Sequence, residues 1–370
     1  MKKKNPNRIL FLILLFILFP ATLPARKSIE AGIPFFVQGD TLTLSKVFFR
    51  GTDVQASAGG QTLHITEDQG FFHISLPLCL PSPGEIRIIS SGVSFSLFLD
   101  KKDLPLGFIR LPRECVEGVA ILVEIMPSVP LERLEIRRDG EKVPLYRGSA
   151  NQVLFYLAYP LLSRREESRL VITAVTQKGD VRSQSVLIRV KEGRYKKEHL
   201  TLGAVYTGDD GLESIRAALL GYENRKAARL LLSKSGRISP SRPEFLKPVE
   251  GRITSPFGII RSYNGRGYRT YHTGTDIGGN PAGTPVTAPL GGDVLCAEDF
   301  YGRGLTVILD HGYGVKSLYY HLDRLAVSAG DEVVQGDILG DVGTTGFSTG
   351  PHLHWEVRVN NIPVDPLQFP

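Results

Sequence analysis

The sequence predicts a mainly β protein of several domains with one helical segment between them. Short runs in which apolar and polar residues alternate recur from about residue 28 to residue 192, and turn-forming residues separate them. The apolar spacing becomes helical between residues 209 and 232, and strand-like runs return from about residue 247. We therefore expect one or two N-terminal β-sandwich domains of the immunoglobulin-like type, a short helical connector and a C-terminal antiparallel β-sheet domain.

Residues 1–25 have the composition of an export signal. They contain four basic residues, no acidic residue and an apolar run from Ile9 to Phe19. A run of this length forms about 16 Å of helix, which is short of the roughly 20 residues that cross a bilayer. Leu23-Pro24-Ala25 is an imperfect cleavage site because Leu23 is not small. Export to the periplasm or cell envelope is therefore expected, and a leader retained as an inner-membrane anchor stays open.

The N-terminal half is expected to contain two β domains, at residues 28–100 and 105–192. Their alternating runs lie at residues 62–65, 72–76, 85–89, 120–125 and 186–190. Asp139-Gly140 and residues 178–180 have the residue types of hairpin turns. These domains would position the C-terminal domain, bind the cell wall or a protein partner in the cell envelope, or only space the C-terminal domain from the membrane.

The connector is expected at residues 193–246. Asp209 or Asp210 is a candidate helix cap, because acidic residues accept hydrogen bonds from the first free N–H groups of a helix and apolar residues at helical spacing follow. The role of this helix is expected to be packing. Residues 233–247 contain two prolines and several basic residues, which is typical of a linker.

Charge and cysteine content limit the classes of function. Of the formal net charge of +6, four positive charges belong to the leader, which leaves +2 for the rest of the chain. Nucleic acid is therefore not expected as a partner, and membrane contact is expected only through an uncleaved leader. Three cysteines are too few for a disulfide scaffold. Cys79 and Cys115 could pair in an oxidising compartment, which would leave Cys296 buried in a strand.

The C-terminal domain, expected at residues 247–370, is rich in histidine. Five of the eight histidines of the chain lie within its last hundred residues. The motifs that contain candidate metal ligands and proton carriers are His272-Thr273-Gly274-Thr275-Asp276, Tyr320-His321-Leu322 and His352-Leu353-His354. Three such side chains suffice to hold a divalent metal, and two histidines remain for acid–base chemistry. This excess over a structural site indicates catalysis.

The last motif begins a predicted strand. Side chains alternate along a strand, so His352, His354 and Glu356 are expected to share one face. The opposite, apolar face is formed by Leu353, Trp355, Val357 and Val359. This alternation is typical of a half-buried strand, and Glu356 is therefore expected to be a solvated residue rather than a catalytic base.

The first motif requires a bend. His272 and Asp276 would be neighbours on a helix, but the glycines and threonines around them make a helix improbable. On a straight strand the two residues would lie roughly 13 Å apart, which is too far to share one ion. We therefore expect a bend at Gly274 to bring them together.

The donor types indicate which metal is bound. Two imidazoles and one carboxylate with an open fourth position are typical of a catalytic zinc site. A structural zinc site would more often use thiolates and would close all four positions, and the chain has no Cys-x-x-Cys pair. The sequence therefore favours a catalytic zinc ion over a structural one.

The region from about Phe245 to Pro370 resembles the LytM/lysostaphin-type zinc metalloendopeptidases, which cut peptides in bacterial cell walls. The resemblance is carried by Ser255-Pro256-Phe257-Gly258, His272-x-x-x-Asp276, Gly283-Thr284-Pro285-Val286, Tyr320-His321-Leu322 and the segment from Ser348 to Glu356. It covers the C-terminal third of the chain, and the order and separation of these motifs make it specific. It implies a metallopeptidase domain with the antiparallel sheet of the LytM, or duplicated hybrid motif, type.

Position by position, the resemblance implies that His272, Asp276 and His354 are the ligands of one zinc ion per chain. It makes His321 and His352 the catalytic pair beside the water that the metal binds. One histidine would assist deprotonation of that water, and the other would stabilise the oxyanion or protonate the leaving amine. Which histidine does which stays open. The implied substrate is a peptide of peptidoglycan, such as a D-alanyl–meso-diaminopimelate cross-link.

The other histidines are expected to have no catalytic role. His64, His73 and His199 lie in the predicted N-terminal domains and connector, where a lone histidine is usually a surface or core residue. His311, in Asp310-His311-Gly312, is expected to shape a turn.

Three other functions stay open. A degenerate LytM-like domain would bind and activate a wall amidase without cutting peptides, but such domains lack ligands and this chain has the full set of five residues. An iron oxygenase also uses two histidines and a carboxylate, but the His-x-x-x-Asp spacing and the extra histidines disfavour it. Residues 330–338 have the turn rhythm of biotinyl or lipoyl carriers, yet they lack the lysine that a carrier needs.

Overall fold

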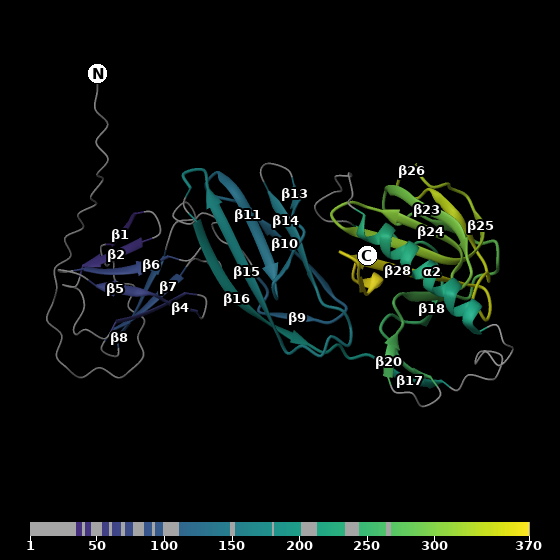
Figure 1. Ribbon diagram of the computed structural model, residues 1–370, viewed down its shortest axis with the longest axis horizontal. Helices are drawn as coiled ribbons and strands as arrows, with labels where there is room; N and C mark the ends of the chain where they lie inside the picture. The colour runs from purple at the N-terminus through teal and green to yellow at the C-terminus, as the bar shows by residue number, and fades with distance from the viewer. Residues whose placement is uncertain are drawn as a thin grey trace, which may run out of the picture. The chain divides into compact units, whose positions relative to one another are not determined.

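The computed structural model shows a mainly β chain with one long helix among the residues that it describes (Figure 1). These residues are 35–38, 41–45, 54–58, 61–67, 71–76, 85–90, 93–98, 111–148, 152–179, 181–200, 213–233, 244–263 and 268–369. The predicted leader, the predicted caps Asp209 and Asp210, and Cys79 lie outside them. Within these ranges, no helix combines the length and apolar character that crossing a bilayer requires.

The chain divides into two compact units, and the first consists of residues 1–110, 127–133 and 174–184. Two four-stranded antiparallel sheets lie in it, with the orders β1-β2-β6-β5 and β4-β3-β7-β8. Their strands are β1 (Phe35–Gln38), β2 (Thr41–Ser45), β3 (Val54–Ala58), β4 (Gln61–Leu63), β5 (Ile65–Glu67), β6 (Phe71–Ser75), β7 (Glu85–Ser90) and β8 (Val93–Phe98). Leu42, Ile74, Ile86 and Ile88 from both sheets share one buried core. The immunoglobulin-like topology and the domain boundaries stay predictions.

The second unit contains residues 111–126, 134–173 and 185–370. Most residues of two further sheets, with the orders β10-β14-β13 and β12-β11-β15-β16-β9, lie in its N-terminal part. The strands are β9 (Glu114–Val116), β10 (Ala120–Ile125), β11 (Leu131–Arg138), β12 (Glu141–Lys142), β13 (Tyr146–Arg147), β14 (Val153–Ala158), β15 (Glu167–Thr176) and β16 (Val181–Lys191). Asp139 and Gly140 join β11 to β12 with positive φ angles of 52° and 89°, which confirms the predicted hairpin turn.

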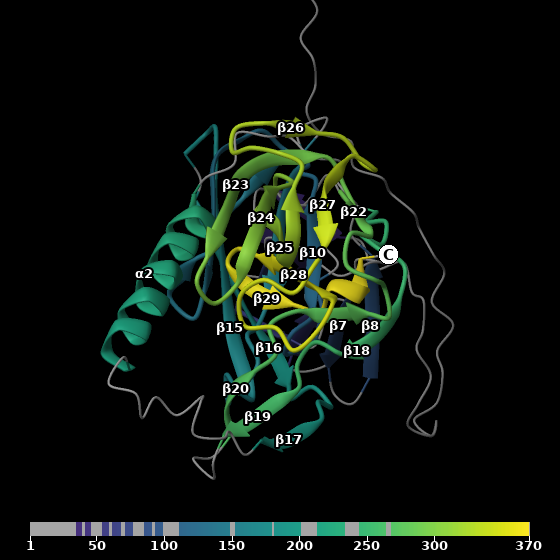
Figure 2. The same ribbon diagram turned by 90° about the vertical axis from the view of Figure 1, so that its right-hand side faces the viewer.

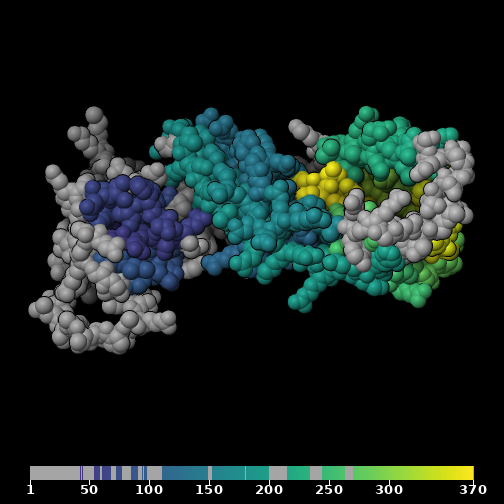
Figure 3. All heavy atoms as spheres, turned by 60° about the horizontal axis from the view of Figure 1, so that its bottom comes forward, coloured from purple at the N-terminus to yellow at the C-terminus, as the bar shows by residue number. Residues whose placement is uncertain are grey.

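The connector helix α2 spans Glu213–Leu232, close to the predicted range. Figure 2 shows it beside β23, and its green atoms form part of the surface in Figure 3. Its buried face is formed by Ala227 and Leu231, which pack with Cys296, Phe300, Ile308, Leu318 and Tyr320 of the C-terminal sheet. Cys296 is therefore buried in a strand, as expected, and Cys115 is a buried free thiol.

The C-terminal domain is built on a ten-stranded sheet that follows the order β18-β21-β28-β25-β24-β23-β26, with β22, β27 and β29 paired at its sides. A separate three-stranded sheet has the order β17-β19-β20. The elements are β17 (Lys197–Leu200), β18 (Arg252–Ser255), β19 (Ile260–Tyr263), β20 (Tyr268–Tyr271), β21 (Thr275–Gly278), β22 (Pro285–Thr287), β23 (Gly292–Phe300), β24 (Gly304–Asp310), β25 (Val315–Leu325), β26 (Glu332–Val333), β27 (Ile338–Val342), β28 (His352–Val359), β29 (Ile362–Val364) and the 3-10 helix η3 (Pro366–Gln368). The expected antiparallel sheet is confirmed.

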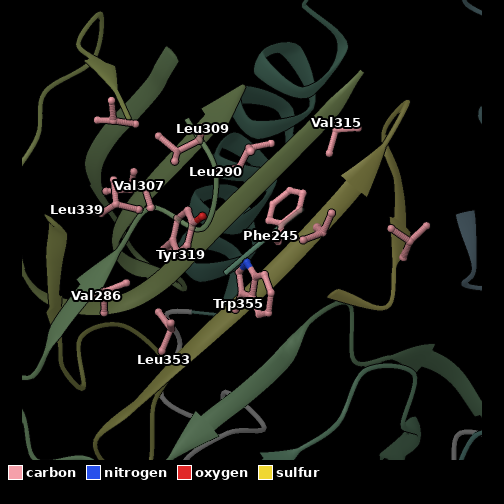
Figure 4. Packing of buried hydrophobic residues seen from close by; sticks show 14 of the residues in the cluster. Phe245, Val286, Leu290, Val307, Leu309, Val315, Tyr319, Leu339, Leu353 and Trp355 are labelled. Carbon is pink, nitrogen blue, oxygen red and sulfur yellow. The ribbon is translucent and has the colours of Figure 1, made fainter. Parts of the chain in front are cut away.

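The core of this domain lies on one face of the central strands. Leu353, Trp355 and Val357 of β28 are fully buried there with Tyr319 of β25 and Phe245 (Figure 4). The predicted apolar face of β28 is therefore confirmed. The opposite face of the same strand carries the histidines, so the core fixes the strand from which they project.

Candidate metal centre

Strand pairing brings the first and last histidine motifs together. Strand β21 pairs antiparallel with β28, and Asp276 lies directly opposite His354 in the register. His272 directly follows β20 and lies three residues before β21 begins, and the chain bends between them at Gly274, as predicted. A Cβ atom at Gly274 would lie 2.5 Å from the carbonyl oxygen of Trp355 and 2.7 Å from Nε2 of His354. Only glycine therefore lets the bend approach β28 so closely.

Three donor atoms converge at this bend. Oδ1 of Asp276 lies 3.1 Å from Nε2 of His272 and 2.8 Å from Nδ1 of His354, and the two nitrogens are 3.0 Å apart. No other group in the described part of the chain brings three such donors together. Two imidazole nitrogens and a carboxylate oxygen form the donor set of a catalytic zinc site.

The outer ring nitrogens of the two histidines support this geometry. Nδ1 of His272 lies 3.0 Å from the carbonyl oxygen of Pro256, which can only accept, so Nδ1 carries the proton and Nε2 presents its lone pair. Nε2 of His354 is buried without a hydrogen-bond partner, and the nearest carboxylate oxygen, from Glu356, is 3.8 Å away. A metal on Nδ1 would require Nε2 to carry the proton beside that carboxylate, so the residues fit the ion.

The charges of the cluster favour a cation. Burial alone would raise the pKa of Asp276, but its contacts with the imidazoles of His272 and His354 lower it well below its usual range. Burial alone would lower the pKa of His354, yet the carboxylates of Asp276 and Glu356 raise it to about 9. Both shifts show that the described residues stabilise positive charge between the two carboxylates.

His321 and His352 lie beside the cluster, and their ring centroids are 4.9 Å apart. Nδ1 of His321 donates to the carbonyl of Thr345 at 2.8 Å, and Nδ1 of His352 donates to the carbonyl of Gly350 at 2.8 Å. Each ring therefore has Nε2 free to accept a proton. Burial, more than the nearby histidines, lowers the pKa of His321 to about 4, so this ring is neutral near pH 7. The structure thus gathers all five predicted site residues in one place.

Glu356 is buried, and the prediction that it is solvated is wrong. It is 1% exposed, and its carboxylate accepts hydrogen bonds from Thr273 Oγ1 at 3.1 Å, Tyr320 at 3.2 Å and Arg358 Nε at 2.5 Å. Burial would raise its pKa, but Arg358 and His354 lower it to about 2. The prediction failed because side chains from other segments, Thr273 before β21 and Tyr320 of β25, lie against the polar face of β28 and cover it as well. An arginine two residues further along the same face was the available signal.

The other histidines lie outside the cluster. His311 is fully buried, and its ring nitrogens bond to the carbonyl of Gly291 at 2.9 Å and the hydroxyl of Ser317 at 2.7 Å. These contacts belong to the turn and the start of β25, which agrees with a structural role. His199 lies in β17, and His73 lies in β6 of the first unit.

Comparison with known proteins agrees with the site. Residues 270–366 match the family model described as peptidase family M23. The C-terminal region of this chain belongs to peptidase family M23. The matched residues contain all three members of the metal cluster and both flanking histidines. The predicted resemblance is therefore confirmed, and it makes this region a metallopeptidase domain.

Curated relatives have names that agree with this family. The chain is 40% identical over 141 residues to the DD-carboxypeptidase/endopeptidase Mpg of Neisseria meningitidis, which is 36% of this chain and 31% of that protein. It is 37% identical over 117 residues to the peptidoglycan DD-endopeptidase ShyB of Vibrio cholerae, which is 32% of this chain and 27% of that protein. The alignments thus span about a third or less of the length of these two curated relatives.

One solved structure matches beyond the M23 domain. It is a crystal structure from Pseudomonas aeruginosa described as a candidate peptidase M23, with 26% sequence identity and a TM-score of 0.50. The match covers 69% of this chain and 94% of that one. Because 69% of the chain is longer than the C-terminal domain, the similarity includes residues upstream of that domain.

Proposed function

We propose that this chain is an exported, zinc-dependent endopeptidase that hydrolyses peptide cross-links in bacterial peptidoglycan. The observation that carries the proposal is the convergence of three metal-donor atoms, from His272, Asp276 and His354, next to two histidines with free Nε2 atoms. Membership of the M23 family makes the domain a metallopeptidase, and the names of its relatives direct the proposal to peptidoglycan.

In this proposal His272, Asp276 and His354 hold one zinc ion per chain. Zinc bound there would supply a Lewis acid that polarises the scissile carbonyl and acidifies the attacking water. The protein supplies the proton carriers, because Nε2 of His321 and of His352 can each accept or return a proton while Nδ1 stays bonded to a backbone carbonyl. One histidine would take the proton from the water, and the other would stabilise the oxyanion or protonate the leaving amine.

Backbone hydrogen bonds and burial prepare His321 and His352 for this role. A ring whose Nδ1–H is fixed by a carbonyl cannot rotate freely, so Nε2 is held towards the site before the substrate arrives. The low pKa of His321 keeps that ring in the neutral, proton-accepting form at neutral pH. The two histidines would therefore act as an oriented pair.

The proposed location and partners follow from the sequence and the relatives. Residues 1–25 have the composition of an export signal, and peptidoglycan lies outside the inner membrane, so we place the protein in the periplasm or cell envelope. The peptide of peptidoglycan is the proposed substrate. A protein partner in the envelope is proposed for the N-terminal β domains, and membrane contact only for an uncleaved leader.

The second candidate function is that of an activator of a wall amidase without peptidase activity. The complete donor set and the two free Nε2 atoms disfavour it, because an activator needs neither. An iron oxygenase is disfavoured by the same two histidines and by the M23 match.

The test uses the purified chain and cross-linked muropeptide dimers. We expect zinc at one ion per chain, conversion of dimers to monomers, and loss of this activity with a chelator. A zinc-loaded, folded protein that leaves dimers intact but switches on a separate amidase would establish the activator function instead. Iron at one ion per chain would contradict the zinc assignment.

A further inference from the structure

His321 lies at an irregular point of strand β25. Its φ of +63° is in the left-handed region, which a residue other than glycine keeps only where its surroundings enforce it. The pairing of β24 with β25 shifts register between Leu305 and Val307, opposite this residue. The N–H of His321 donates to the carbonyl of Arg303 at 2.9 Å, and its ring donates to the carbonyl of Thr345. Backbone groups outside the regular sheet therefore hold it in place.

The turn that supplies the first of these carbonyls is held by the connector helix. The N–H of Gly302 donates to both carboxylate oxygens of Glu223, at 3.0 and 3.2 Å. The guanidinium of Arg303 lies 3.5 Å from the same carboxylate and donates to Oδ1 of Asn224 at 2.8 Å. A Cβ atom at Gly302 would lie 2.8 Å from Cδ2 of Leu220, so helix and turn are in close contact.

The carboxylate of Glu223 is buried, with 3% of the residue exposed. A buried carboxylate is costly unless it is paired, so the contacts with Gly302 and Arg303 are the arrangement that keeps it there. The guanidinium of Arg303 also lies over the ring of Tyr320, 5.4 Å from its centroid, and that ring stacks parallel to His354 at 4.9 Å. The contacts of Glu223 thus lead to His321 through the backbone and to a proposed zinc ligand through two side chains.

We propose that Glu223 is a positioning residue for His321, and that it acts through the turn formed by residues 301–304. By fixing Gly302 and Arg303, it fixes the carbonyl that holds the left-handed backbone of His321. Helix α2 lies outside residues 270–366, which the family model matches, so the M23 domain of this chain depends on an element from its own connector. The inference rests on the proposed peptidase function, because it concerns the proton-carrying histidine of that reaction.

The helix has other contacts that keep it docked when Glu223 is changed. Ala227 and Leu231 pack on the sheet, and the ammonium of Lys316 donates to the carbonyl of Ser233 at 3.0 Å just after the last turn. Lys226 pairs with Glu298 and does not contact the turn at residues 301–304. Lys226→Ala is therefore a matched control on the same helix, since it removes an ion pair between helix and sheet without removing support from His321.

The experiment compares Glu223→Ala, Glu223→Gln and Lys226→Ala in the full, zinc-loaded chain. We expect Glu223→Ala to lower kcat by about 10- to 100-fold with KM changed by less than about threefold, because small displacements of a proton carrier are costly. Glu223→Gln should keep more of the activity, because an amide oxygen still accepts from Gly302. Lys226→Ala should stay within about twofold of wild type. Zinc should remain at one ion per chain in all three.

A measurement independent of turnover is the NMR signal of the His321 imidazole, assigned with His321→Ala. It should move in Glu223→Ala and stay in place in Lys226→Ala. An unchanged signal with wild-type kcat in Glu223→Ala would overturn the inference, as would an equal loss of kcat in Lys226→Ala, which would show that helix docking alone matters. If Glu223→Ala does not fold, the same NMR signal is measured in Glu223→Gln. A shift of the His321 signal there supports the inference, and an unchanged signal with wild-type kcat overturns it. If the wild-type chain cuts no dimers, but the His321 signal still moves in Glu223→Ala, the proposed function is refuted and the positioning contact is established.

Discussion

The two faces of strand β28 are both buried, but by different chemistry. Leu353, Trp355 and Val357 point into the apolar core, whereas His354 and Glu356 face a network of charged and polar groups. Close packing of apolar side chains stabilises the apolar face, and paired charges with hydrogen bonds stabilise the polar face. We infer that a change on the apolar face mainly lowers stability, and that a change on the polar face mainly lowers metal binding and turnover.

The largest effect on turnover is expected from loss of a metal donor on the polar side. His272→Ala and Asp276→Ala each remove one of three converging donor atoms, and two protein ligands are too few for a stable zinc site. We expect less than one zinc ion per chain after dialysis and no detectable cutting of muropeptide dimers. Metal analysis of the folded variants checks this, and retention of one tightly bound zinc ion would show that the ligand assignment is wrong.

The second effect concerns residues that adjoin the metal without holding it. His321→Ala and His352→Ala should each lower kcat by about 10²-fold or more, because each removes a proton carrier. Zinc content should stay near one ion per chain, since neither ring is in the donor cluster. Metal analysis beside kcat separates the two roles. If either variant loses its zinc, that histidine is a ligand.

The third prediction tests the comparison with adjacent residues. Glu356→Gln, on the polar face, should weaken zinc binding by about 10- to 100-fold, because the carboxylate nearest to Nε2 of His354 is lost. Val357→Ala, on the apolar face, should leave zinc binding unchanged and lower the free energy of unfolding by about 2 kcal/mol, since it removes two buried methyl groups. Zinc titration and thermal unfolding of both variants provide the readouts. An equal loss of zinc affinity in Glu356→Gln and Val357→Ala would show that the polar and apolar faces of β28 do not differ in their effect on metal binding.

The same strand shows what the sequence could and could not predict. Residue type predicted that His272, Asp276 and His354 could hold a metal, and the structure brings their donor atoms together. Alternation predicted the face of β28 that carries His354. The burial of Glu356 was missed because alternation describes one strand, whereas burial depends on the side chains that other segments place against its face, here Thr273 and Tyr320. The sequence could not predict the contact of Glu223 with the turn at residues 301–304 for a related reason. This contact joins residues 79 positions apart, and neither the helix nor the turn has a pattern that indicates its partner.

A similar limit applies to register and backbone strain. That Asp276 lies opposite His354 follows from the pairing of β21 with β28, which the sequence did not specify. The left-handed backbone of His321 follows from an irregularity in the pairing of β24 with β25. Both features arise between strands, so single-strand patterns predict the chemistry of the site and leave its geometry open.

The smallest effect on turnover is expected from mild acid. Burial lowers the pKa of His321 to about 4, although the Thr345 carbonyl opposes this shift. A histidine with its ordinary pKa of about 6.5 would be roughly nine-tenths protonated at pH 5.5, but His321 stays neutral because its pKa lies below that pH. Loss of the neutral form should therefore reduce kcat/KM by less than about twofold between pH 7 and pH 5.5.

The sign of the linked stability follows from the same shift. The unfolded chain binds a proton on this ring below about pH 6.5, whereas the folded chain resists protonation until about pH 4. The contribution of His321 to stability is therefore complete above pH 6.5 and is lost as the pH falls towards 4. The profile of kcat/KM should be recorded with the zinc content measured at each pH, because loss of metal also lowers turnover. An NMR signal of the His321 imidazole that titrates near pH 6.5 with zinc retained would show that this ring is open to water and would contradict the prediction.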